Sequence, residues 1–511
     1  MIHGITEIKK LQHTDIMKLK KLLKEIPVQL VKGSKEIEIT GICINSKLVA
    51  PGNLFIAKKG RTSDGSQYIP EAISAGATCI LSDMYDPSLK EVTQLIHPDV
   101  TAIEALLATH FYQFASRQLF MVGITGTNGK TTTSFLVRHL LDGLCGTCGL
   151  IGTIEYIIGQ QRYQATRTTP DVSMNHKMLR EMVLQDCKNA VMEVTSHALD
   201  QGRVSHVEFD VAVFTNLTVD HLDYHLTMDN YCSAKNQLFR SLDPRSIHKP
   251  FKKAAIVNVD SPWHKPMLEG CKASILTYGV EQPADVKASD IEMGGHGTTF
   301  KLTYENKTHI CKSPLIGRYN VYNVLAAVSV ALSRQIPVET ILERVSTFVS
   351  VPGRLEPVPN ALGLQIYVDF AHSDDALTNV LDCLQELKKG GRIITVFGCG
   401  GDRDQTKRPL MARAAEELSD MCIVTSDNPR SEDPAKIVQQ VFSGFKQGHK
   451  HIIEIDRYAA IEKAINIATA QDVILIAGKG HEPYQIFAHK IIEFDDRKVA
   501  AQICKSKQAL S

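Results

Sequence analysis

The segment Gly126-Thr127-Asn128-Gly129-Lys130-Thr131-Thr132 combines glycines, a lysine and hydroxyl side chains in one short run. Backbone N–H groups of a glycine-rich turn converge on anionic oxygens, and a following helix N-terminus adds partial positive charge. In such a loop the lysine reaches the β- and γ-phosphates of a nucleotide, and the adjacent threonine hydroxyl ligates Mg²⁺. The strict motif has glycine where this chain has Ile124, so the loop is a variant. It predicts binding of ATP or GTP phosphates.

Oxygen-bearing side chains that could hold the magnesium ion follow two apolar segments further along the chain. Glu193 stands near the end of residues 190–194, and a polar block, residues 215–225, follows another apolar run. Mg²⁺ prefers oxygen ligands, and ligands of an open α/β sheet bind beyond the carboxyl ends of its strands. His221 and His225 have the i, i+4 spacing of a zinc pair, but neither an H-E-x-x-H motif nor a third ligand accompanies them. We therefore expect magnesium at this edge and not zinc.

The apolar periodicity around these residues is that of strands alternating with helices. Residues 119–125 form a β-rich run before the glycine loop, and residues 134–144 are apolar at helical spacing after it. Further strand patterns occur at residues 190–194, 211–215, 254–259, 365–370, 393–398, 421–425, 452–455 and 473–477. Buried strands of this kind, separated by helices, form mostly parallel sheets covered on both faces. The fold class predicted is α/β, with two doubly wound parts.

The chain of 511 residues is longer than one hydrophobic core usually supports. Short apolar runs and turn signals before residue 100 indicate a small α/β unit, whereas residues 281–312 alternate like antiparallel strands. A helix around residues 323–333 precedes a hinge-like Val351-Pro352-Gly353. We predict three domains: a small N-terminal α/β domain (1–100), a central P-loop ATPase domain (101–352) and a C-terminal Rossmann-like domain (353–511).

The composition excludes several classes of protein. A formal net charge of +1 provides no field for nucleic acid, and no run approaches the roughly 20 apolar residues that span a membrane. The lysine-rich residues 1–25 lack the apolar core of a secretory signal and predict a solvated helix. The scattered cysteines fit reduced thiols, since Cys145 and Cys148 have no second pair to complete a zinc site. We expect a cytoplasmic monomer whose partners are small molecules.

Ordered motifs beyond the glycine loop extend along nearly the full chain. They are Met192-Glu193-Val194-Thr195-Ser196-His197, the block 215–225, Ala234-Lys235, Gly317-Arg318-Tyr319-Asn320 with Asn323, Pro352-Gly353-Arg354, Asp369-Phe370-Ala371-His372 and Gly398-Cys399-Gly400-Gly401-Asp402-Arg403. Together they resemble the motifs of the Mur ligases, the ATP-dependent amide-forming enzymes that build the peptide of bacterial cell-wall precursors.

Within that family, Asp427-Asn428-Pro429-Arg430 is similar to the motif that accompanies meso-2,6-diaminopimelate as the amino acid joined to UDP-N-acetylmuramoyl-L-alanyl-D-glutamate. Diaminopimelate ends in both an ammonium and a carboxylate, and a guanidinium can clamp a carboxylate with two hydrogen bonds. L-Lysine ends only in an ammonium and would leave Arg430 unpaired in a desolvated pocket. The resemblance implies two steps. The D-glutamate carboxylate takes the γ-phosphate of ATP to form an acyl phosphate, and the amino acid's amine then displaces phosphate.

The resemblance also implies roles for the central motifs. The catalytic residues would be Lys130, Glu193, His221 and Lys235, and the magnesium ligands would be Thr131, Glu193, His221 and Lys235 as a carbamate (N6-carboxylysine). Carbamylation matters because it turns a cation into an anion that can support a metal site. The ATP contacts would be the loop 126–132 with Asn320, Arg354 and Asp369. His372 lies near these in the sequence, and Asp374 stands where the family usually has proline.

Two substrate sites follow from the same resemblance. The UDP-substrate contacts would be Ser46, Thr168, Thr169, Thr195, Gln201 and Arg203. The diaminopimelate contacts would be Arg403, Asp427, Asn428, Pro429, Arg430, Gly478 and Glu482, with Glu482 facing an ammonium. The usual Asp-Ser-Arg of the N-terminal domain reads Asn45-Ser46-Lys47 here, so only the serine is retained. Because the ligands would contact different domains, we expect domain closure before chemistry.

Alternative functions share some of these motifs. The same ligase could use L-lysine. A folylpolyglutamate synthase has the ATPase loop and the lysine, but lacks the separate N-terminal uridine-binding domain and the Asp-Asn-Pro-Arg motif. A P-loop switch that reads guanine would carry Asn-Lys-x-Asp, which this sequence lacks, and would leave the C-terminal domain unexplained. A binding module with a dead site is disfavoured because Lys130, Thr131, Glu193, His221 and Lys235 are all present.

Overall fold

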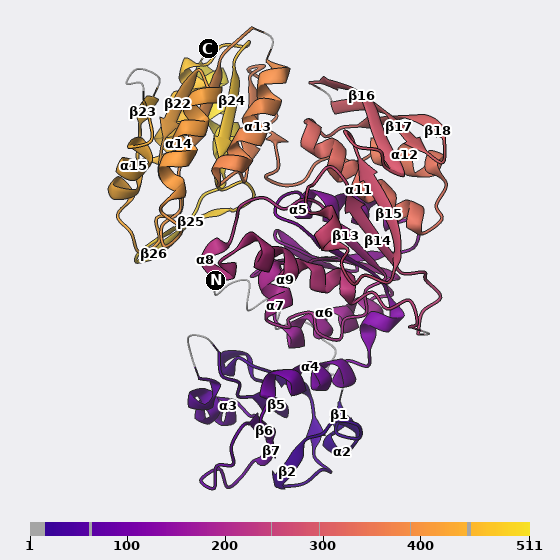
Figure 1. Cartoon of the computed structure of the whole chain (residues 1–511). Coiled ribbons are helices and arrows are strands. Elements are labelled where there is room, and N and C mark those ends of the chain that lie inside the picture. Colours follow the sequence, from indigo (N-terminus) through magenta and orange to yellow (C-terminus); the bar gives the residue numbers. More distant parts are fainter. Residues whose placement is uncertain are drawn as a thin grey trace. The chain divides into compact units, whose positions relative to one another are not determined.

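The computed structural model describes residues 16–60, 64–246, 248–295, 297–388, 390–446 and 451–510. Its contacts divide the chain into two compact units, residues 1–286 with 326–341 and residues 287–325 with 342–511 (Figure 1). The predicted α/β class is confirmed, whereas the three domain boundaries stay a prediction. Across the described ranges, no helix has the length and apolar character to cross a membrane.

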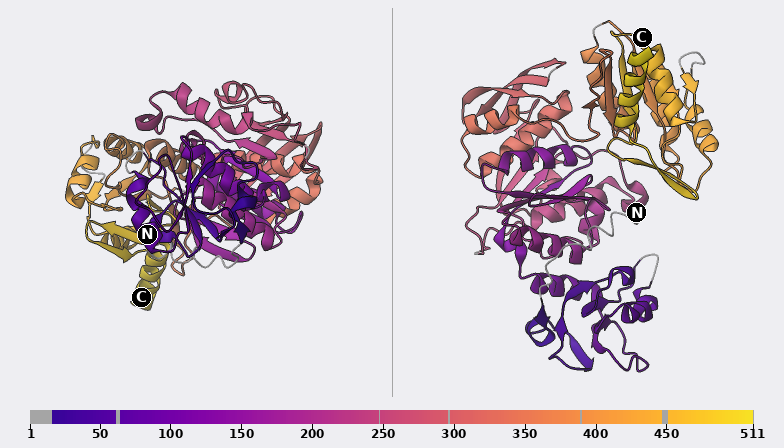
Figure 2. Two further views of the ribbon diagram at one scale, coloured as in Figure 1. Left: turned by 90° about the horizontal axis from the view of Figure 1, so that it is seen from below. Right: turned by 180° about the vertical axis from the view of Figure 1, so that it is seen from behind.

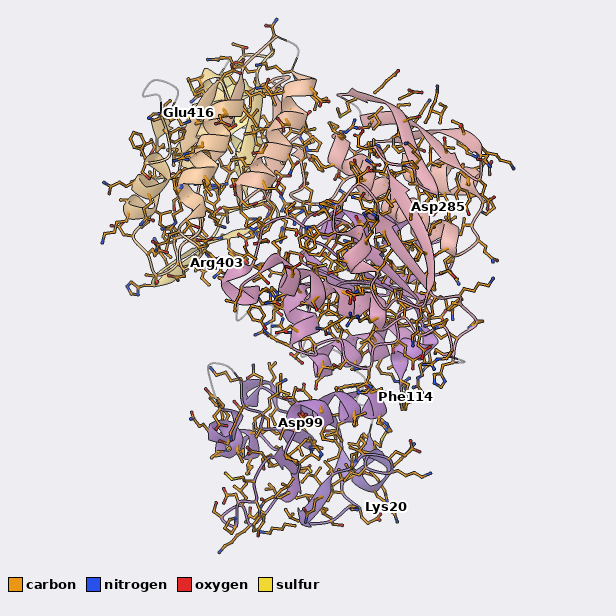
Figure 3. The ribbon with its side chains drawn as sticks, in the orientation of Figure 1. Lys20, Asp99, Phe114, Asp285, Arg403 and Glu416 are labelled. Atoms are coloured by element: carbon orange, nitrogen blue, oxygen red, sulfur yellow. The ribbon has the colours of Figure 1, made fainter. Side chains whose placement is uncertain are left out.

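The first unit begins with a small sheet of strand order β2-β7-β6-β5-β4, in which β4 to β7 run parallel and β2 antiparallel. Its strands are β2 (Gln29–Lys32), β4 (Gly41–Cys43), β5 (Asn53–Ile56), β6 (Cys79–Ser82) and β7 (Thr93–Ile96). Around it lie β1 (Met17–Lys18), β3 (Glu38–Ile39), α2 (Leu19–Leu22), η1 (Ser46–Leu48), η2 (Gly65–Tyr68), α3 (Ile69–Ser74) and α4 (Val100–Phe111). The carboxylate of Asp99, labelled in Figure 3, caps α4 by accepting from Ala102 N at 2.9 Å.

The solvated helix expected in residues 1–25 is wrong in its described part. Helix α2 is a single turn, and it buries Leu19 and Leu22 in the core of the small sheet. In the sequence, lysines flank and separate Leu19 and Leu22, so these two residues did not stand out as an apolar pattern. Residues 1–15 lie outside the described residues.

The same unit contains the larger sheet, of strand order β11-β10-β9-β12-β8-β13-β14-β15. Its strands are β8 (Phe120–Thr125), β9 (Cys148–Ile151), β10 (Glu155–Ile158), β11 (Gln161–Gln164), β12 (Asn189–Glu193), β13 (Val211–Phe214), β14 (Ala254–Asn258) and β15 (Ser274–Gly279). Strands β9, β12, β8, β13, β14 and β15 pair in parallel, as predicted. From β8 the chain first fills the β9 and β12 positions on one side and then crosses to β13 on the other. The carboxyl end of β8 is therefore a topological switch point, where open α/β sheets bind ligands.

Helices cover this larger sheet. They are η3 (Ala115–Gln118), α5 (Lys130–Leu141), α6 (Val172–Leu184), α7 (Ser196–Asp200), α8 (Leu222–His225), α9 (Met228–Arg240) and α10 (His264–Met267). One core cluster joins α6 and α9 to alternate residues of β8, β12 and β13, such as Met121, Met192 and Phe214. Helix α5 contacts β8, β9 and β12 with its own buried side chains, Leu136 and Leu140. This packing fixes the start of α5 against the end of β8.

The second unit contains antiparallel strands and a second parallel sheet. Strands β16 (Val286–Gly294), β17 (Gly297–Tyr304) and β18 (Lys307–Ser313) follow one another, with β17 and β18 antiparallel as expected for residues 281–312. Helices α11 (Arg318–Ser333) and α12 (Val338–Ser346) come next in the chain, and their residues between 326 and 341 belong to the first unit. Helix α11 begins five residues before the predicted start at residue 323, because its first turn carries polar residues that the apolar pattern does not reveal.

The parallel sheet of this unit has the order β19-β20-β24-β21-β22-β23. Its elements are β19 (Glu356–Pro357), β20 (Gln365–Asp369), α13 (Asp374–Leu387), β21 (Ile393–Phe397), α14 (Lys407–Leu418), β22 (Met421–Val424), α15 (Pro434–Phe442), β23 (His451–Ile453), α16 (Arg457–Ile467), β24 (Val473–Ala477), the hairpin β25 (Tyr484–Phe487) and β26 (Lys490–Glu493), and α17 (Asp496–Leu510). One core lies under α13, α14 and α15, and a second lies under α16 and α17. Figures 1 and 2 show these helix groups on opposite faces, which is the doubly wound arrangement predicted.

A buried ion cluster stabilises the end of the larger sheet opposite the switch point. Asp210, immediately before β13, accepts from Lys249 Nζ at 2.7 Å and from Lys253 Nζ at 2.9 Å. Its carboxylate also accepts from Met121 N at 2.8 Å, and none of the three charged side chains is more than 4% exposed. Burial lowers the pKa of Lys249 to about 8, although Asp210 opposes that shift.

Replacing Asp210 by Asn is expected to lower the unfolding free energy of this region by about 3 kcal/mol, because two buried ammonium groups lose their counter-charge. The sequence contains a single tryptophan, Trp263, and it packs against the core of the larger sheet. Its fluorescence during urea unfolding therefore reports on this region. The control is Asp243→Asn, which removes an exposed ion pair to Arg245 and should leave the urea midpoint unchanged. Equal midpoints for both variants would contradict the role of Asp210.

Candidate functional site

The glycine loop connects the end of β8 to the start of α5. Ile124 is buried within β8, so the loop proper begins at Gly126, whose φ is +147°. Helix α5 begins at Lys130, four residues before the predicted helical segment, and Gly129 at φ +83° occupies its N-cap. The loop and the first turn of the helix therefore have the arrangement that binds a phosphate.

Residues after β13 hold the loop in place from the neighbouring strand. The backbone N–H groups of Thr127 and Asn128 donate to Asn216, at 2.8 Å to its carbonyl and 2.9 Å to its side-chain oxygen. The Thr215 hydroxyl donates to the Asn128 carbonyl at 2.6 Å. A Cβ on Gly126 would overlap Thr215 Oγ1. Glycine is therefore required at position 126 by both backbone conformation and space.

Two lysines converge on the carbonyl oxygen of Gly126. Lys130 Nζ donates to it at 3.0 Å and to the Thr127 carbonyl at 2.8 Å, while Lys235 Nζ donates to it at 2.8 Å from α9. The ring of Tyr231, one turn earlier in α9, lies 4.5 Å from Lys235 Nζ. Lys235 is 1% exposed, and burial lowers its pKa well below the ordinary value, with Lys130 acting in the same direction. The exposed surface lysine that sequence alone allowed at this position is excluded.

The Glu193 carboxylate lies at the end of β12 beside the first turn of α5. Glu193 Oε2 accepts from the hydroxyls of Thr131 at 3.0 Å and Thr153 at 2.8 Å. Glu193 Oε1 accepts from Thr153 N at 3.0 Å and from the Ser134 hydroxyl at 3.3 Å. Every one of these donors lies at the carboxyl edge of the sheet. Thr131 and Glu193, predicted as magnesium ligands from separate motifs, are thus in direct contact.

This donor set fits a magnesium ion. Carboxylate and hydroxyl oxygens are hard ligands, and Mg²⁺ is usually bound through one or two carboxylates together with substrate phosphates. Among the described residues, no group of three or more His, Cys, Asp or Glu side chains is arranged as a metal site. A site built from Glu193, Thr131 and nucleotide oxygens requires no such group.

His221 belongs to a cluster of aromatic side chains near the two lysines. It adopts a left-handed conformation, φ +55°, as the N-cap of α8, and its ring lies 4.8 Å from that of His197. Burial lowers the pKa of His221, and the nearby Lys130 and Lys235 lower it further. A neutral imidazole of this kind can accept a proton or ligate a metal. The other histidine of the i, i+4 pair, His225, instead makes a 2.9 Å contact with Ser196 Oγ.

The predicted UDP-substrate threonines adjoin the Glu193 cluster. Thr168 Oγ1 lies 3.1 Å from Thr153 Oγ1. The Thr169 hydroxyl donates to the Glu193 carbonyl at 2.8 Å and lies 3.3 Å from Thr195 Oγ1. Two short chains of hydroxyl groups therefore meet at Glu193, Thr168 with Thr153 at its carboxylate and Thr195 with Thr169 at its carbonyl.

Arg203 extends the second of these chains outward. Its Nη1 donates to the Thr169 carbonyl at 3.0 Å, and its Nη2 donates to Gln201 Oε1 at 2.6 Å. Ser46 lies in η1 of the small sheet, where its buried hydroxyl donates to Glu71 at 2.6 Å. The described contacts thus group Arg203 and Gln201 with Thr169, and they give Ser46 a partner on α3, beside the small sheet.

In the second unit, the predicted ATP contacts lie near the ends of β20 and α11. Asn320 is buried and donates to the Ile316 carbonyl at 2.8 Å. Asp369 accepts from Leu355 N at 2.6 Å and from Ala371 N at 2.7 Å. Burial raises the pKa of Asp369, whereas the adjacent Arg354 opposes that shift. Asp374, which replaces the usual proline, is the first residue of α13, so the loop ends in an ordinary helix start capped by Ser373.

The predicted diaminopimelate residues meet at the carboxyl ends of β21, β22 and β24. Asn428 Nδ2 donates to Glu482 Oε2 at 2.7 Å, and Arg430 Nη1 donates to the Gly401 carbonyl at 2.7 Å. Burial raises the pKa of Glu482, and the nearby Asp427 carboxylate raises it further. Burial lowers the pKa of Arg403, with Arg430 acting in the same direction. The pocket therefore contains two carboxylates and two guanidinium groups, a match for a ligand with charges of both signs.

Sequence reasoning missed several residues of these sites. Thr153 and Ser134 contact Glu193, and Tyr231 covers Lys235. Thr153 follows β9 at the same edge as Glu193, but β9 was not among the predicted strands, so the sequence pattern gave no signal for Thr153. Ser134 and Tyr231 lie within helices, where sequence spacing alone does not reveal which buried polar group they face.

Comparisons with known proteins match three segments of the chain to one family. Residues 38–112 match the Mur ligase family catalytic domain, residues 124–331 the Mur ligase middle domain, and residues 353–480 the Mur ligase glutamate ligase domain. Two similar proteins are named UDP-N-acetylmuramoyl-L-alanyl-D-glutamate--2,6-diaminopimelate ligase. The protein of Chlamydia pneumoniae is 43% identical over 96% of this chain and 100% of its own. That of Syntrophomonas wolfei is 40% identical over the same shares.

Solved structures agree with the fold. A structure titled as UDP-N-acetylmuramoyl-L-alanyl-D-glutamate--2,6-diaminopimelate ligase is 29% identical and has a TM-score of 0.67, covering 97% of this chain and 100% of its own. A Thermotoga maritima MurF ligase in complex with ADP, 17% identical, has a TM-score of 0.65 and covers 92% of this chain and 98% of its own. Because the MurF ligase is only 17% identical to this chain, its similarity supports the fold and nothing about function.

Substituting Gly126 by Ala is expected to reduce ADP binding at least tenfold, because the new Cβ would displace Thr215 or the loop itself. Isothermal titration with ADP measures this effect. The matched control is Gly143→Ala, at a glycine with φ +85° and no heavy atom within 4 Å of the added Cβ. It shares the conformational penalty but should bind ADP normally. Equal affinity for the two variants would contradict the assignment of the loop.

Proposed function

This chain belongs to the Mur ligase family and is an ATP-dependent amide-forming ligase, and from that premise we propose its substrates and the roles of its residues. It joins meso-2,6-diaminopimelate to the D-glutamate of UDP-N-acetylmuramoyl-L-alanyl-D-glutamate, a step of peptidoglycan precursor synthesis. Relatives that are 40% to 44% identical over 96% or more of the chain carry this name. Asp427-Asn428-Pro429-Arg430 supports the same amino acid.

The observation that carries the choice of amino acid is the charge pattern beyond β22 and β24. Arg430 and Arg403 lie near the carboxylates of Asp427 and Glu482 in a partly desolvated pocket. Diaminopimelate supplies a carboxylate for a guanidinium and an ammonium for Glu482. The side chain of L-lysine supplies only the ammonium, so its binding would bury Arg430 without a carboxylate to offset its charge. The alternative amino acid is therefore disfavoured by charge and not by size.

In the first step, the chain's residues position the γ-phosphate and offset its charge. The N–H groups of Thr127 and Asn128 are engaged by Asn216, so the start of α5 would face the phosphates, and Lys130 would leave the loop carbonyls to reach them. Mur ligases use ATP with Mg²⁺, and here Thr131 and Glu193 would hold the ion, which neutralises charge on the phosphate oxygens. Phosphoryl transfer depends mainly on such positioning and neutralisation.

In the second step, the amine of diaminopimelate attacks the acyl phosphate, the C–N bond forms and inorganic phosphate leaves with the C–O bonding electrons. Recognition of the distal carboxylate by Arg430 fixes the far end of the amino acid, which reduces the entropy cost of aligning its amine. The hydroxyls of Thr168, Thr169 and Thr195, with Gln201 and Arg203, would hold the muramyl-peptide side of the substrate. Ser46 would contact the uridine part.

Lys235 is the proposed site of carbamylation. An unprotonated amine is the species that attacks CO2, giving the N-carboxylate and releasing one proton. Burial and the proximity of Lys130 favour the neutral amine of Lys235. The resulting anion would lie beside Lys130 and next to Gly126, where a negative charge is better tolerated than a second ammonium. His221, close to both lysines, would support the attacking carboxylate through a metal.

Amino-acid-dependent ADP formation with the UDP-muramyl dipeptide tests the proposed function. Diaminopimelate should support turnover at least tenfold better than L-lysine or L-ornithine. Replacing Arg430 by Ala should lower kcat/KM for diaminopimelate about 10- to 100-fold, since a hydrogen bond to a charged group contributes roughly 1.5 to 3 kcal/mol. Activity with lysine should change little.

The control for that experiment is Arg413→Ala, which removes an exposed arginine from α14 of the same sheet. This variant should leave kcat/KM unchanged for both diaminopimelate and lysine. Equal rates with diaminopimelate and lysine in the unmodified protein would refute the proposed substrate. ADP release independent of both substrates would instead support a P-loop switch.

Carbamylation of Lys235 predicts a carbamate resonance in ¹³C NMR spectra after incubation with ¹³C-bicarbonate. That resonance should be absent from Lys235→Ala and present in Lys188→Ala, which removes an exposed lysine. Preparation in CO2-free buffer should lower kcat at least fivefold, and bicarbonate should restore it. A resonance that persists in Lys235→Ala, or activity indifferent to CO2, would show that the unmodified amine is the working form.

A further inference from the structure

The diaminopimelate pocket is built from loops that the sheet does not hold together. Residues 426–430 follow β22, and residues 478–482 follow β24. In the sheet these strands are separated by β21 and share no hydrogen bonds, because the order is β20-β24-β21-β22. Strand pairing therefore fixes each loop relative to β21 but leaves the spacing between the two pocket loops to other contacts.

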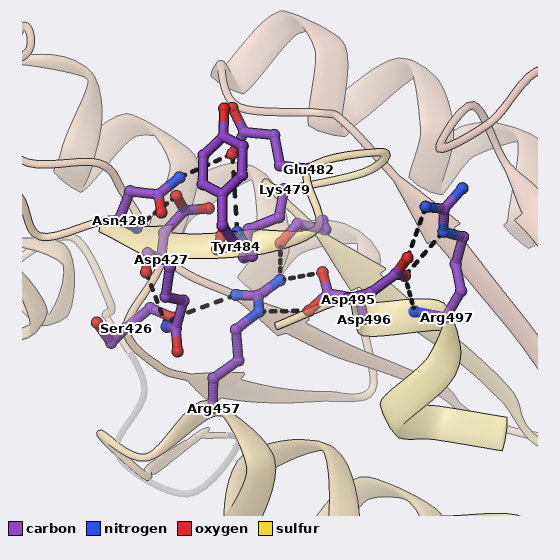
Figure 4. Close-up of polar contacts among 12 residues, drawn as sticks. Ser426, Asp427, Asn428, Arg457, Lys479, Glu482, Tyr484, Asp495, Asp496 and Arg497 are labelled. Carbon is purple, nitrogen blue, oxygen red and sulfur yellow. Dashed lines mark hydrogen bonds and ion pairs between the residues drawn. The ribbon is translucent and has the colours of Figure 1, made fainter. Parts of the chain in front are cut away.

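A single buried guanidinium reaches both loops. Arg457, the first residue of α16, donates from Nη1 to the Ser426 carbonyl at 3.3 Å and from Nη2 to the Ala477 carbonyl at 3.0 Å. Ser426 immediately precedes Asp427, and Ala477 immediately precedes Gly478. Figure 4 shows Arg457 below the two loops, with Glu482 and Asn428 on the opposite side.

The charge of Arg457 is satisfied from a third element. Asp496, the first residue of α17, accepts from Arg457 Nε at 2.8 Å and from Nη2 at 2.7 Å, and both side chains are 0% exposed. This bidentate pairing fixes the plane of the guanidinium and so the direction of its remaining N–H groups. The fork geometry allows one side chain to span two carbonyls, which an ammonium on a flexible stem does less well.

Other contacts on the same loops are consistent with this arrangement. Gln485 of β25 donates to the Asp427 carbonyl at 2.8 Å, and Asn428 donates to Glu482 at 2.7 Å. Lys479 donates to the Tyr484 carbonyl and lies 3.7 Å from Glu482 Oε2. The Lys479 bond attaches the loop after β24 to the hairpin, the Gln485 bond attaches the loop after β22 to the same hairpin, and the Asn428 bond joins the two loops at their outer ends. Arg457 alone among these side chains bonds to the base of both loops.

We infer that Arg457 is a positioning residue for amino-acid specificity, which sets the separation of Asp427 and Glu482 from beneath the pocket without touching the amino acid. This inference rests on the proposed function for its substrate and on the contacts above for its geometry. A displacement of about 1 Å between the two loops would weaken simultaneous recognition of both charges of diaminopimelate. Sites for ATP and for the UDP substrate involve other residues and should not respond.

The chain offers a matched control in the same sheet. Arg392 pairs with Asp472 through Nη2 at 2.8 Å and also donates to the Ile467 carbonyl at 2.8 Å. This Arg–Asp pair lies at the amino ends of β21 and β24, away from the pocket loops. Arg457→Lys and Arg392→Lys therefore remove the same fork chemistry, each keeping a positive charge opposite its aspartate.

Two measurements on these variants test the inference. Arg457→Lys should raise the KM for diaminopimelate about tenfold while the KM for ATP changes less than twofold, and Arg392→Lys should change neither. Amide hydrogen exchange, which needs no substrate, should accelerate in residues 426–430 and 478–482 of Arg457→Lys only. The double variant Arg457→Gln/Asp496→Asn leaves no unpaired buried charge, so it should fold even if Arg457→Lys does not. It should show the same change in KM and in hydrogen exchange as Arg457→Lys.

Unchanged exchange and an unchanged KM in Arg457→Lys would overturn the inference. So would a parallel rise in the KM of all three substrates, because that indicates general destabilisation. If the unmodified protein fails to respond to diaminopimelate, the proposed substrate is wrong, and the exchange measurement still decides whether Arg457 positions the two loops.

Discussion

The carboxylate of Glu193 is a negative charge buried at the carboxyl edge of a parallel sheet, and the surrounding elements are arranged to satisfy it. Hydroxyl and N–H donors reach it from the first turn of α5 and from the end of β9, and the Thr169 hydroxyl reaches the carbonyl of the same residue. A buried charge is tolerated only when it is paired or hydrogen-bonded. The position of Glu193 therefore determines where the loop helix, Thr153 and the substrate-side threonines lie.

The two lysines beside this carboxylate create the opposite problem. Lys130 and Lys235 share one acceptor, the Gly126 carbonyl, although their charges repel. Such an arrangement is costly without anions nearby, and ATP phosphates supply them for Lys130. For the more deeply buried Lys235, the proposed carbamate would remove that repulsion.

The C-terminal sheet uses a buried cation where the central sheet uses a buried anion. Arg457 is fully buried, and its guanidinium contacts the loops that follow two non-adjacent strands. In both sheets, a charge placed beyond hydrogen-bonded strands links loops that strand pairing cannot link. The recognition of a ligand with charges of both signs depends on that linkage.

Strands β8, β12, β13, β14 and β20 to β24 could be predicted from the sequence because buried parallel strands are continuous apolar runs, and β8, β12 and β20 lie within a residue of their predicted limits. The parallel strands β9 and β15 were missed. The first residues of helices were harder to predict from the sequence. Helices α5 and α11 begin at polar residues, Lys130 and Arg318, which the apolar periodicity does not register. The helix expected in residues 1–25 was wrong where it is described, because a short buried apolar pair is hidden among lysines.

By itself, the sequence determined the phosphate loop, the order of the motifs and the proposal that Arg430 distinguishes the amino acid, since these depend on residue type and local spacing. Only the tertiary structure decided that Thr131 meets Glu193, that Lys130 and Lys235 share an acceptor, and that Arg457 lies beneath two loops. Apart from the local bond between Lys130 and Gly126, those contacts join residues 20 to 109 positions apart. They are set by strand order and helix packing, which local patterns do not encode.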